Sequence, residues 1–384
     1  MPFENDDFRR ALDAVLGASR RGAADAGEAL ATAARIPDGD ADAWLLEWTA
    51  TAGAAWAAAR GGPTVSARSH YLRAATYYAA ALSQVAFSTE PEREGDLWRR
   101  QRACWDRAAD LLGGERLAVP YEDTALPGYF FRAPGAAPGE PRALVVLNNG
   151  SDGATSAMWA LGGAAAAERG HHWMTFDGPG QQAARYEQRL TFRPDWEAVL
   201  RPVADAMVAR PDVDARRLAV VGAGQAGYWI PRALAFEHRF AAAVVDPGVV
   251  DVSTAWTHAL SAEQRERLEL GDSAGFDRDM HVAELFSPTV TARLHAYGAP
   301  YGVNGGSRYG LFERLTEYRL GDEVGRITTP LLLTEPGGER LWPGQSQRLY
   351  DRLTGPRELL RFADDDGPAL REARIFDWLD GYLA

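Results

Sequence analysis

Cysteine is almost absent from this sequence, because Cys104 is the only one among its 384 residues. A single thiol cannot close a disulfide within the chain and cannot build a cysteine-ligated metal cluster. Long apolar runs are missing too, since no stretch approaches the roughly 18 uninterrupted apolar residues that a membrane helix needs. The acidic first residues also lack the apolar segment of a secretory signal. We therefore expect a cytoplasmic protein with no disulfide and no membrane segment.

Positive charge is scarce as well, since 41 Lys and Arg residues stand against 53 Asp and Glu residues, a formal charge of −12. Binding to nucleic acid needs Lys and Arg clustered on one face, so this balance argues against nucleic acid and anionic membranes as partners. The sequence contains no H-E-x-x-H and no P-loop, and the adjacent His171 and His172 would alternate across a strand. We expect no metal, no cofactor and a small molecule as the partner. A homodimer is left open.

The first 113 residues predict helices throughout. Apolar residues recur at three- and four-residue spacing over about 6–33, 41–60, 64–88 and 92–112. Short segments rich in Pro, Gly and Asp separate these stretches. We therefore assign residues 1–113 to a helical N-terminal region.

From about residue 115 the pattern changes to short apolar segments that alternate with helices. This alternation predicts an α/β fold with a mostly parallel sheet. The strand signal vanishes between residues 252 and 325, where helical stretches such as 262–270 and 307–318 take its place. We divide the remainder into a first core segment at 114–250, a helical cap at 251–325 and a second core segment at 326–384. The strand candidates are 117–120, 128–132, 143–147, 172–176, 218–221, 241–245 and 330–333.

Residues 222–227 read Gly-Ala-Gly-Gln-Ala-Gly and lie between a predicted strand and a predicted helix. Taken literally, they are the G-x-G-x-x-G turn that brings a dinucleotide pyrophosphate to a helix N-terminus. Asp246 lies nineteen residues past Gly227, where an acidic residue would bind a ribose hydroxyl. Against this, core strands precede the turn, and the helical insertion soon follows it. The same residues also fit the nucleophile elbow G-x-S-x-G, with Gly224 in place of the serine.

Residues outside the elbow favour the second interpretation. Asn-Asn-Gly-Ser-Asp-Gly at 148–153 follows one buried strand, and Phe-Asp-Gly-Pro-Gly-Gln at 176–181 follows the next. Phe-Arg-Pro-Asp-Trp at 192–196 and the tyrosine-rich helix at 71–78 complete the set. Together these motifs resemble the branch of α/β-hydrolases that includes 2,6-dihydroxypseudooxynicotine hydrolase, the FrsA-like proteins and the fungal polyketide-shortening hydrolases, over about 40–384. The resemblance implies an α/β-hydrolase fold whose members cleave C–C or ester bonds of ketones and acylated aromatics with a Ser-His-Asp type triad.

This sequence departs from that pattern at two catalytic positions. Gly224 has no hydroxyl to attack a carbonyl, and the amide of the neighbouring Gln225 is a poor nucleophile. A strained elbow backbone is also a conformation that glycine adopts at little cost. The general base should lie between the last strand and the C-terminal helix, in the segment that we place at 359–368. None of the seven histidines lies there.

The resemblance assigns roles to the remaining polar residues. Asn149, Gly150 and Ser151 would form the oxyanion loop, beside the elbow residues Gly224 and Gln225. Within the same segment, Asp152 could work as a general acid or base if it is partly buried. It could instead cap a helix that begins near Ala154.

Three further groups of residues are weaker candidates. Glu339 is favoured as the acid of the triad, with Glu335 next, and the alternative is that Glu339 is a solvated loop carboxylate. Without a histidine to orient, Glu339 has no triad role. His258 could face the pocket from the cap, or lie packed or on the surface. The candidates to line the pocket are His70, Tyr71, Tyr228 and Trp342. We expect the N-terminal region and the cap to close over a pocket at the carboxyl ends of the strands.

Three functions remain open from the sequence. The first is proton-transfer chemistry on a ketone- or acyl-bearing aromatic or polyketide-like molecule, such as cyclisation, retro-aldol cleavage or dehydration, because stabilising an enolate needs no nucleophile. The second is a non-catalytic binding protein, a pseudohydrolase. The third comprises a hydrolase with an unrecognised nucleophile and the dinucleotide enzyme. The Ala-, Arg- and Gly-rich composition suggests a GC-rich bacterial genome and secondary metabolism.

Overall fold

The chain forms two compact units in a computed structural model that describes residues 2–303, 306–363 and 365–384, without the side chain of Pro288. One unit comprises residues 1–116, 129–132 and 154–169, and the other comprises residues 117–128, 133–153 and 170–384. The cap therefore belongs to the same compact unit as most of the sheet. Within the described residues, no helix is long and apolar enough to cross a membrane.

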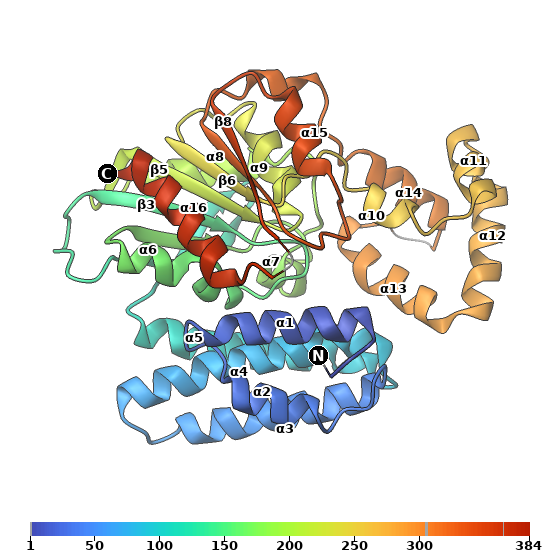
Figure 1. Cartoon of the computed structure of the whole chain (residues 1–384), viewed down its shortest axis with the longest axis horizontal. Helices are drawn as coiled ribbons and strands as arrows, with labels where there is room; N and C mark the ends of the chain where they lie inside the picture. Colours follow the sequence, from blue (N-terminus) through green and yellow to red (C-terminus); the bar gives the residue numbers. More distant parts are fainter. Residues whose placement is uncertain (1, 304–305, 364) are drawn as a thin grey trace. The chain divides into compact units, whose positions relative to one another are not determined.

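The first unit is a bundle of helices (blue to cyan in Figure 1). The helical stretch expected over 6–33 consists of two helices, because Gly22 adopts a positive φ of 67° and the side chain of Asp25 caps a new helix by accepting the backbone N–H of Glu28. The core contains Phe8, Trp44 and Trp48, whose rings are in contact. The helices are α1 Asp6–Ser19, α2 Ala26–Ala33, α3 Ala41–Ala59, α4 Thr64–Gln84, η1 Val85–Phe87, η2 Pro91–Arg93, α5 Glu94–Leu111, the π-helix η3 Trp159–Gly163 and α6 Ala164–Glu168.

An eight-stranded sheet forms the centre of the fold, in the order β1-β2-β4-β3-β5-β6-β7-β8. From β4 to β8 each neighbouring pair is parallel, so the predicted α/β class with a mostly parallel sheet is confirmed. The six residues from Ala143 to Asn148 are all buried, as expected of a strand covered on both faces. The strands are β1 Glu115–Tyr121, β2 Thr124–Phe131, β3 Arg142–Asn148, β4 His172–Phe176, β5 Val213–Ala223, β6 Ala242–Asp246, β7 Leu331–Glu335 and β8 Arg357–Arg361.

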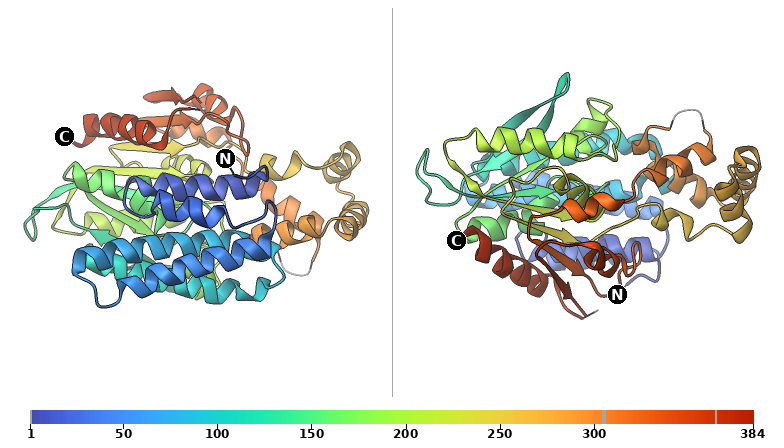
Figure 2. Two further views of the ribbon diagram at one scale, coloured as in Figure 1. Left: turned by 60° about the horizontal axis from the view of Figure 1, so that its bottom comes forward. Right: turned by 90° about the horizontal axis from the view of Figure 1, so that it is seen from above.

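Helices cover both faces of the second unit's sheet. In Figure 2, α8 (light green) and α16 (red) lie on opposite faces of the sheet. Helix α9 packs on β5 and β6 beside α8. The core helices are α7 Gln182–Tyr186, α8 Glu197–Val208, α9 Ala226–Leu234, α15 Gln345–Arg352 and α16 Pro368–Leu383.

The segment between β6 and β7 is helical, as predicted, and its outer helices extend away from the sheet (orange in Figure 1). Among the described residues of this segment, the only β-type backbone pairing is one isolated antiparallel β-bridge between Asp251 and Arg319. Helix α12 packs against α11, α13 and α14. The elements are α10 Thr254–Thr257, α11 Ala262–Leu270, α12 Ser273–Phe286, α13 Pro288–Gly298, η4 Ala299–Tyr301, α14 Arg308–Thr316 and η5 Asp322–Arg326.

Strand β8 corrects the prediction for the segment at 359–368. Residues 357–361 form the edge strand, so the connection to α16 begins at Phe362. The strand was missed because its residues are charged or half-exposed rather than a buried apolar run. Asp364, which we had placed in this connection, lies outside the described residues.

Candidate functional site

The turn between β5 and α9 has the geometry of a sharp strand-to-helix elbow. Gly224 sits at its tip with a positive φ of 58°, and its N–H donates to the backbone oxygen of Asp246 at 2.8 Å. A Cβ on Gly222 would lie 2.7 Å from Cγ1 of Ile230, and one on Gly227 would lie 1.8 Å from the backbone oxygen of Pro247. Gly222 and Gly227 are therefore required because a side chain would clash with neighbouring atoms. At Gly224, glycine is favoured because it adopts a positive φ at little cost.

The acidic residue of the dinucleotide interpretation is already bound to core neighbours. The carboxylate of Asp246 accepts a hydrogen bond of 2.5 Å from Oγ1 of Thr334 and lies 3.6 Å from the guanidinium of Arg371. The packing and backbone conformation of the turn thus explain why its three glycines are glycine. The contacts of Asp246 with Thr334 and Arg371 explain the acidic residue, so neither feature needs a dinucleotide.

The loop after β3 reaches the elbow. A Cβ on Gly224 would lie 3.8 Å from Cα of Gly150. A Cβ on Gly150 would lie 3.1 Å from the backbone oxygen of Ala223 and 3.7 Å from the backbone N of Gln225. The structure therefore brings Gly150, Gly224 and Gln225 together.

Buried hydrogen bonds hold this loop in place. Nε2 of Gln181 donates to the backbone oxygens of Asn149 and Gly150, at 2.7 Å each, while its Oε1 accepts the N–H of Gly178 at 2.9 Å. The side chain of Asn149 accepts the N–H of Gly150 at 2.9 Å and donates to the backbone oxygen of Gly153. Each of these polar groups would be costly to leave unpaired in the interior, so the loop has a defined shape.

The main-chain N–H of Gln225 is the candidate oxyanion donor at this elbow. Helix α9 begins at the next residue, and its first N–H groups have no partner within the helix. In the described chain, no backbone or side-chain acceptor is bonded to the N–H of Gln225. The partial positive charge of a helix N-terminus adds to its attraction for a negative oxygen.

Asp152 lies at the outer end of the same loop and is exposed. Its carboxylate accepts a hydrogen bond from Oγ of Ser151 at 3.3 Å. The alternative that Asp152 caps a helix near Ala154 was wrong, because Ala154 is not helical, the next two residues form a turn, and helical residues begin only at Ala157.

A cluster of aromatic side chains covers the elbow from within the same unit. The hydroxyl of Tyr301, on η4 of the cap, donates to Oε1 of Gln225 at 2.9 Å. The ring of Tyr301 meets Phe192 and Tyr318 edge-on, with centroids 5.0 Å away in each case, and lies 6.0 Å from Trp256. Burial raises the pKa of Tyr301, the hydrogen bond to Gln225 opposes this shift, and the negative charge of Asp152 adds to it. Tyr301 therefore stays protonated at neutral pH.

Sequence reasoning missed Tyr301 and Tyr318, and it placed Gln225 in the elbow without a partner for its side chain. The local signal was a tyrosine in the helical insertion, which does not reveal a contact between residues 76 positions apart. The pocket candidate Tyr228 is buried beside them, with its ring centroid 5.9 Å from that of Tyr318. Its hydroxyl donates to the backbone oxygen of Pro194 at 3.0 Å.

The remaining candidates occupy other places. Oε1 of Glu339 accepts the N–H groups of Leu341 and Trp342 at 2.7 and 3.0 Å, so its carboxylate holds its own loop. Trp342 is buried, and its indole N–H points to the backbone oxygen of Val252 at 3.4 Å. His258 ends α10 and is exposed.

His70 and Tyr71 belong to helix α4 of the first unit. The ring of Tyr71 contacts Trp56 at a centroid distance of 5.3 Å, and Nδ1 of His70 is bonded to the guanidinium of Arg73.

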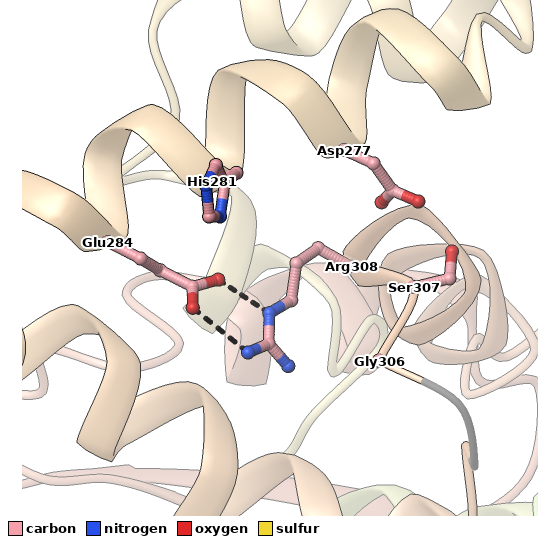
Figure 3. A pocket seen from close by; sticks show the side chains of 6 residues that line it. All are labelled: Asp277, His281, Glu284, Gly306, Ser307 and Arg308. Carbon is pink, nitrogen blue, oxygen red and sulfur yellow. Dashed lines mark hydrogen bonds and ion pairs between the residues drawn. The ribbon is translucent and has the colours of Figure 1, made fainter.

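The cap carries a polar pocket of about 260 Å³ between α12 and α14. Figure 3 shows the guanidinium of Arg308 facing the carboxylate of Glu284, with two hydrogen bonds of 2.5 and 3.0 Å, and His281 beside them. Oδ1 of Asp277 accepts the backbone N–H of Tyr309 at 2.7 Å. The charged groups of Arg308 and Glu284 are thus paired with each other, and the carboxylate of Asp277 has a backbone partner. No group of three or more His, Cys, Asp or Glu side chains that could hold a metal ion occurs in the described part of the chain.

Comparisons with known proteins agree with this geometry. The chain is 35% identical to the hydrolase acrC of Aspergillus aculeatus over 257 residues, which are 61% of this chain and 60% of that relative. It is 27% identical to the alpha/beta hydrolase xenA of Xenoacremonium sinensis, over 96% of this chain and 92% of that protein. The chain thus spans about three fifths of the first relative's length and nearly all of the second's. No protein-family model matches it.

Among solved structures, 2,6-dihydroxy-pseudo-oxynicotine hydrolase has a TM-score of 0.67 and 17% identity, with 96% of each chain covered. The chain is thus similar to alpha/beta hydrolases both in sequence and in fold. AbyA5 is a second structural neighbour, with a TM-score of 0.65, 19% identity and 99% of both chains covered. The predicted alpha/beta hydrolase fold is thereby confirmed. The two relatives come from fungi, so the expected bacterial origin receives no support.

Proposed function

We propose that this alpha/beta hydrolase-fold protein is a non-hydrolytic enzyme that moves protons on a ketone- or acyl-bearing aromatic or polyketide-like molecule. The observation that carries the proposal is the elbow itself. Gly150 and the N–H of Gln225 meet at a turn whose tip, Gly224, has no nucleophilic side chain. Such a site can stabilise an enolate oxygen, but it cannot form an acyl-enzyme.

The chemistry that this arrangement supports is retro-aldol cleavage or dehydration. In retro-aldol cleavage of a β-hydroxyketone, a base takes the hydroxyl proton and the bond between the α and β carbons breaks. Its electron pair forms an enolate, whose oxygen would bind the N–H of Gln225, and a proton then returns to the α carbon. Asp152 is our candidate for the base, because it is the acidic group on the loop that reaches the elbow and it lies near enough to Tyr301 to affect its pKa.

The residues that a serine hydrolase would need give a second line of support. The carboxylate of Glu339 accepts the backbone N–H groups of Leu341 and Trp342 in its own loop. The sequence has no histidine in the connection between β8 and α16. A general base for a serine would have to come from elsewhere in the chain. We therefore propose that the triad is incomplete, that Glu339 has no proton-relay role and that His258 does not act as the base.

A non-catalytic binding protein is the second candidate. The exposure of Asp152 favours it, since a solvated carboxylate is a weaker base than one held in a dry site. Further proposals are a cytoplasmic location, a homodimer and no nucleic-acid partner.

The test uses a β-hydroxyketone that carries a methoxynaphthyl ring. Retro-aldol cleavage releases a fluorescent naphthaldehyde, and dehydration gives an enone with a new absorption band. We expect turnover above the rate in buffer and no hydrolysis of nitrophenyl esters. Binding without turnover would favour the binding protein, and ester hydrolysis with labelling of a serine by a fluorophosphonate would overturn both candidates.

A further inference from the structure

The aromatic cluster at the elbow contains buried polar groups that have no hydrogen-bond partner within the described part of the chain. The side chain of Gln225 is 4% exposed, and its Nε2 has no hydrogen-bond partner among the residues that the structure describes. Tyr318 and Trp229 are fully buried. The hydroxyl of Tyr318 and the indole N–H of Trp229 likewise have no hydrogen-bond partner among the described residues. A buried donor left unpaired costs roughly 1–3 kcal/mol, so native proteins retain few of them, and each needs an explanation.

These groups lie in one continuous cluster. Tyr301 contacts Tyr318, with ring centroids 5.0 Å apart, and donates its hydrogen bond to Gln225. Phe192 lies between Tyr301 and Trp229, at centroid distances of 5.0 and 5.2 Å. The unpaired groups therefore share an aromatic environment next to the elbow.

The hydrogen bond from Tyr301 leaves one end of the Gln225 amide unpaired in either orientation. As the amide stands, Oε1 accepts from Tyr301 and Nε2 is unpaired. If the amide is turned over, Nε2 meets Tyr301 and Oε1 becomes the unpaired end. The side chain is thus held at one end and is available at the other. A side-chain amide with one bonded end and one unpaired end is suited to bind a polar group of a ligand.

We propose that the side chains of Gln225 and Tyr318 form a second oxygen-binding subsite beside the elbow. It takes a hydroxyl or carbonyl oxygen of a substrate whose first carbonyl oxygen binds the main-chain N–H of Gln225. The substrate class that we propose is a β-hydroxyketone or a β-diketone attached to an apolar aromatic or polyene body, because the groups around the subsite are aromatic rings. This inference rests on the proposed function and narrows its substrate class.

The experiment compares two ligands that differ by one hydroxyl group. The first is the methoxynaphthyl β-hydroxyketone, and the second is the same ketone without its hydroxyl. Their dissociation constants are measured by calorimetry for the wild-type protein and for Tyr318→Phe, Gln225→Met and the control Tyr309→Phe, a cap tyrosine outside the cluster. We expect the wild type to bind the hydroxyketone about tenfold more tightly than the deoxy ketone, the scale of one net hydrogen bond.

Tyr318→Phe is expected to remove most of this discrimination without lowering the melting temperature, because it deletes a hydroxyl that has no hydrogen-bond partner among the described residues. Gln225→Met should have the same effect on discrimination, and Tyr309→Phe should have none. Equal binding of the two ketones by the wild type, or unchanged discrimination in Tyr318→Phe, would overturn the subsite and leave the proposed function standing. If the wild type binds neither ketone, the proposed function fails and this inference fails with it.

Discussion

The loop after β3 and the loops after β7 and β8 lie at the same edge of the parallel sheet, but their side chains are used differently. The loop after β3 is held by a side chain from another loop, because Gln181 is 1% exposed and bonds both Asn149 and Gly150. After β7, Glu339 binds N–H groups two and three residues away. After β8, Asp366 accepts the N–H of Ala363 in the same manner.

This difference shows which of these loops the rest of the fold holds in place. Buried hydrogen bonds between distant segments give the loop after β3 a fixed shape, and such bonds are costly to lose. Bonds of Glu339 and Asp366 to near neighbours shape only their own turns. Four substitutions test the comparison, from the largest expected effect to the smallest.

Replacing Gln181 should have the largest effect. Gln181→Ala removes one bond to Gly178 and one each to Asn149 and Gly150, so we expect a loss of folding free energy on the order of 3 kcal/mol. Denaturant unfolding measures this loss. Gln188→Ala is the matched control, because Nε2 of Gln188 makes one bond, to the backbone oxygen of Ala125. Equal effects of the two substitutions would mean that the loop after β3 is not held by Gln181.

The substitution Asp152→Asn tests catalysis at the end of this loop. If Asp152 is the base, turnover of the β-hydroxyketone should fall about 100-fold, the usual scale for a lost general base. The melting temperature should stay unchanged, because the exposed carboxylate bonds only Ser151 in the described chain. Asp123→Asn, an exposed acid in the turn between β1 and β2, controls for the change in charge. Unchanged turnover would place the chemistry on another residue.

The substitution Gly224→Ser asks whether the elbow lacks only its hydroxyl. The new Cβ has room, since the nearest heavy atom, Cα of Gly150, is 3.8 Å away. A positive φ at a residue other than glycine costs roughly 1–2 kcal/mol, so we expect a folded protein that is less stable by about 1 kcal/mol. Gly61→Ser, with φ of 77° and open space around it, should cost a similar amount.

Neither the wild type nor Gly224→Ser should be labelled by a fluorophosphonate, because removing one member of a triad costs nearly as much as removing all of it. Stoichiometric labelling of Gly224→Ser would show that a working base is present and that only the nucleophile is missing.

The substitution Glu339→Gln should have the smallest effect. The amide oxygen can still accept the N–H groups of Leu341 and Trp342, so we expect a change below about 0.5 kcal/mol and unaltered turnover. Glu339→Ala, which removes the acceptor, should destabilise this loop more. A large fall in turnover for Glu339→Gln, at unchanged stability, would restore Glu339 as a catalytic acid and undo the comparison.

The sequence by itself determined the class of fold and the position of the elbow. Continuous apolar runs predicted β3 at 143–147 and β4 at 172–176, where the structure has Arg142–Asn148 and His172–Phe176. These strands are buried on both faces, so local composition identifies them. The strand-to-helix turn at Gly224 was likewise predicted from local sequence, because its flanking glycines leave room for neighbouring segments of the chain.

Only the tertiary structure decided what surrounds the elbow. Strand β8 escaped prediction because an exposed edge strand needs no apolar pattern, only a neighbour to pair with. The contacts of Gln181 with Asn149 and of Tyr301 with Gln225 join segments 32 and 76 residues apart. No local pattern encodes such pairs, because they form only when the folded sheet and cap bring the two segments together and exclude water from their polar groups.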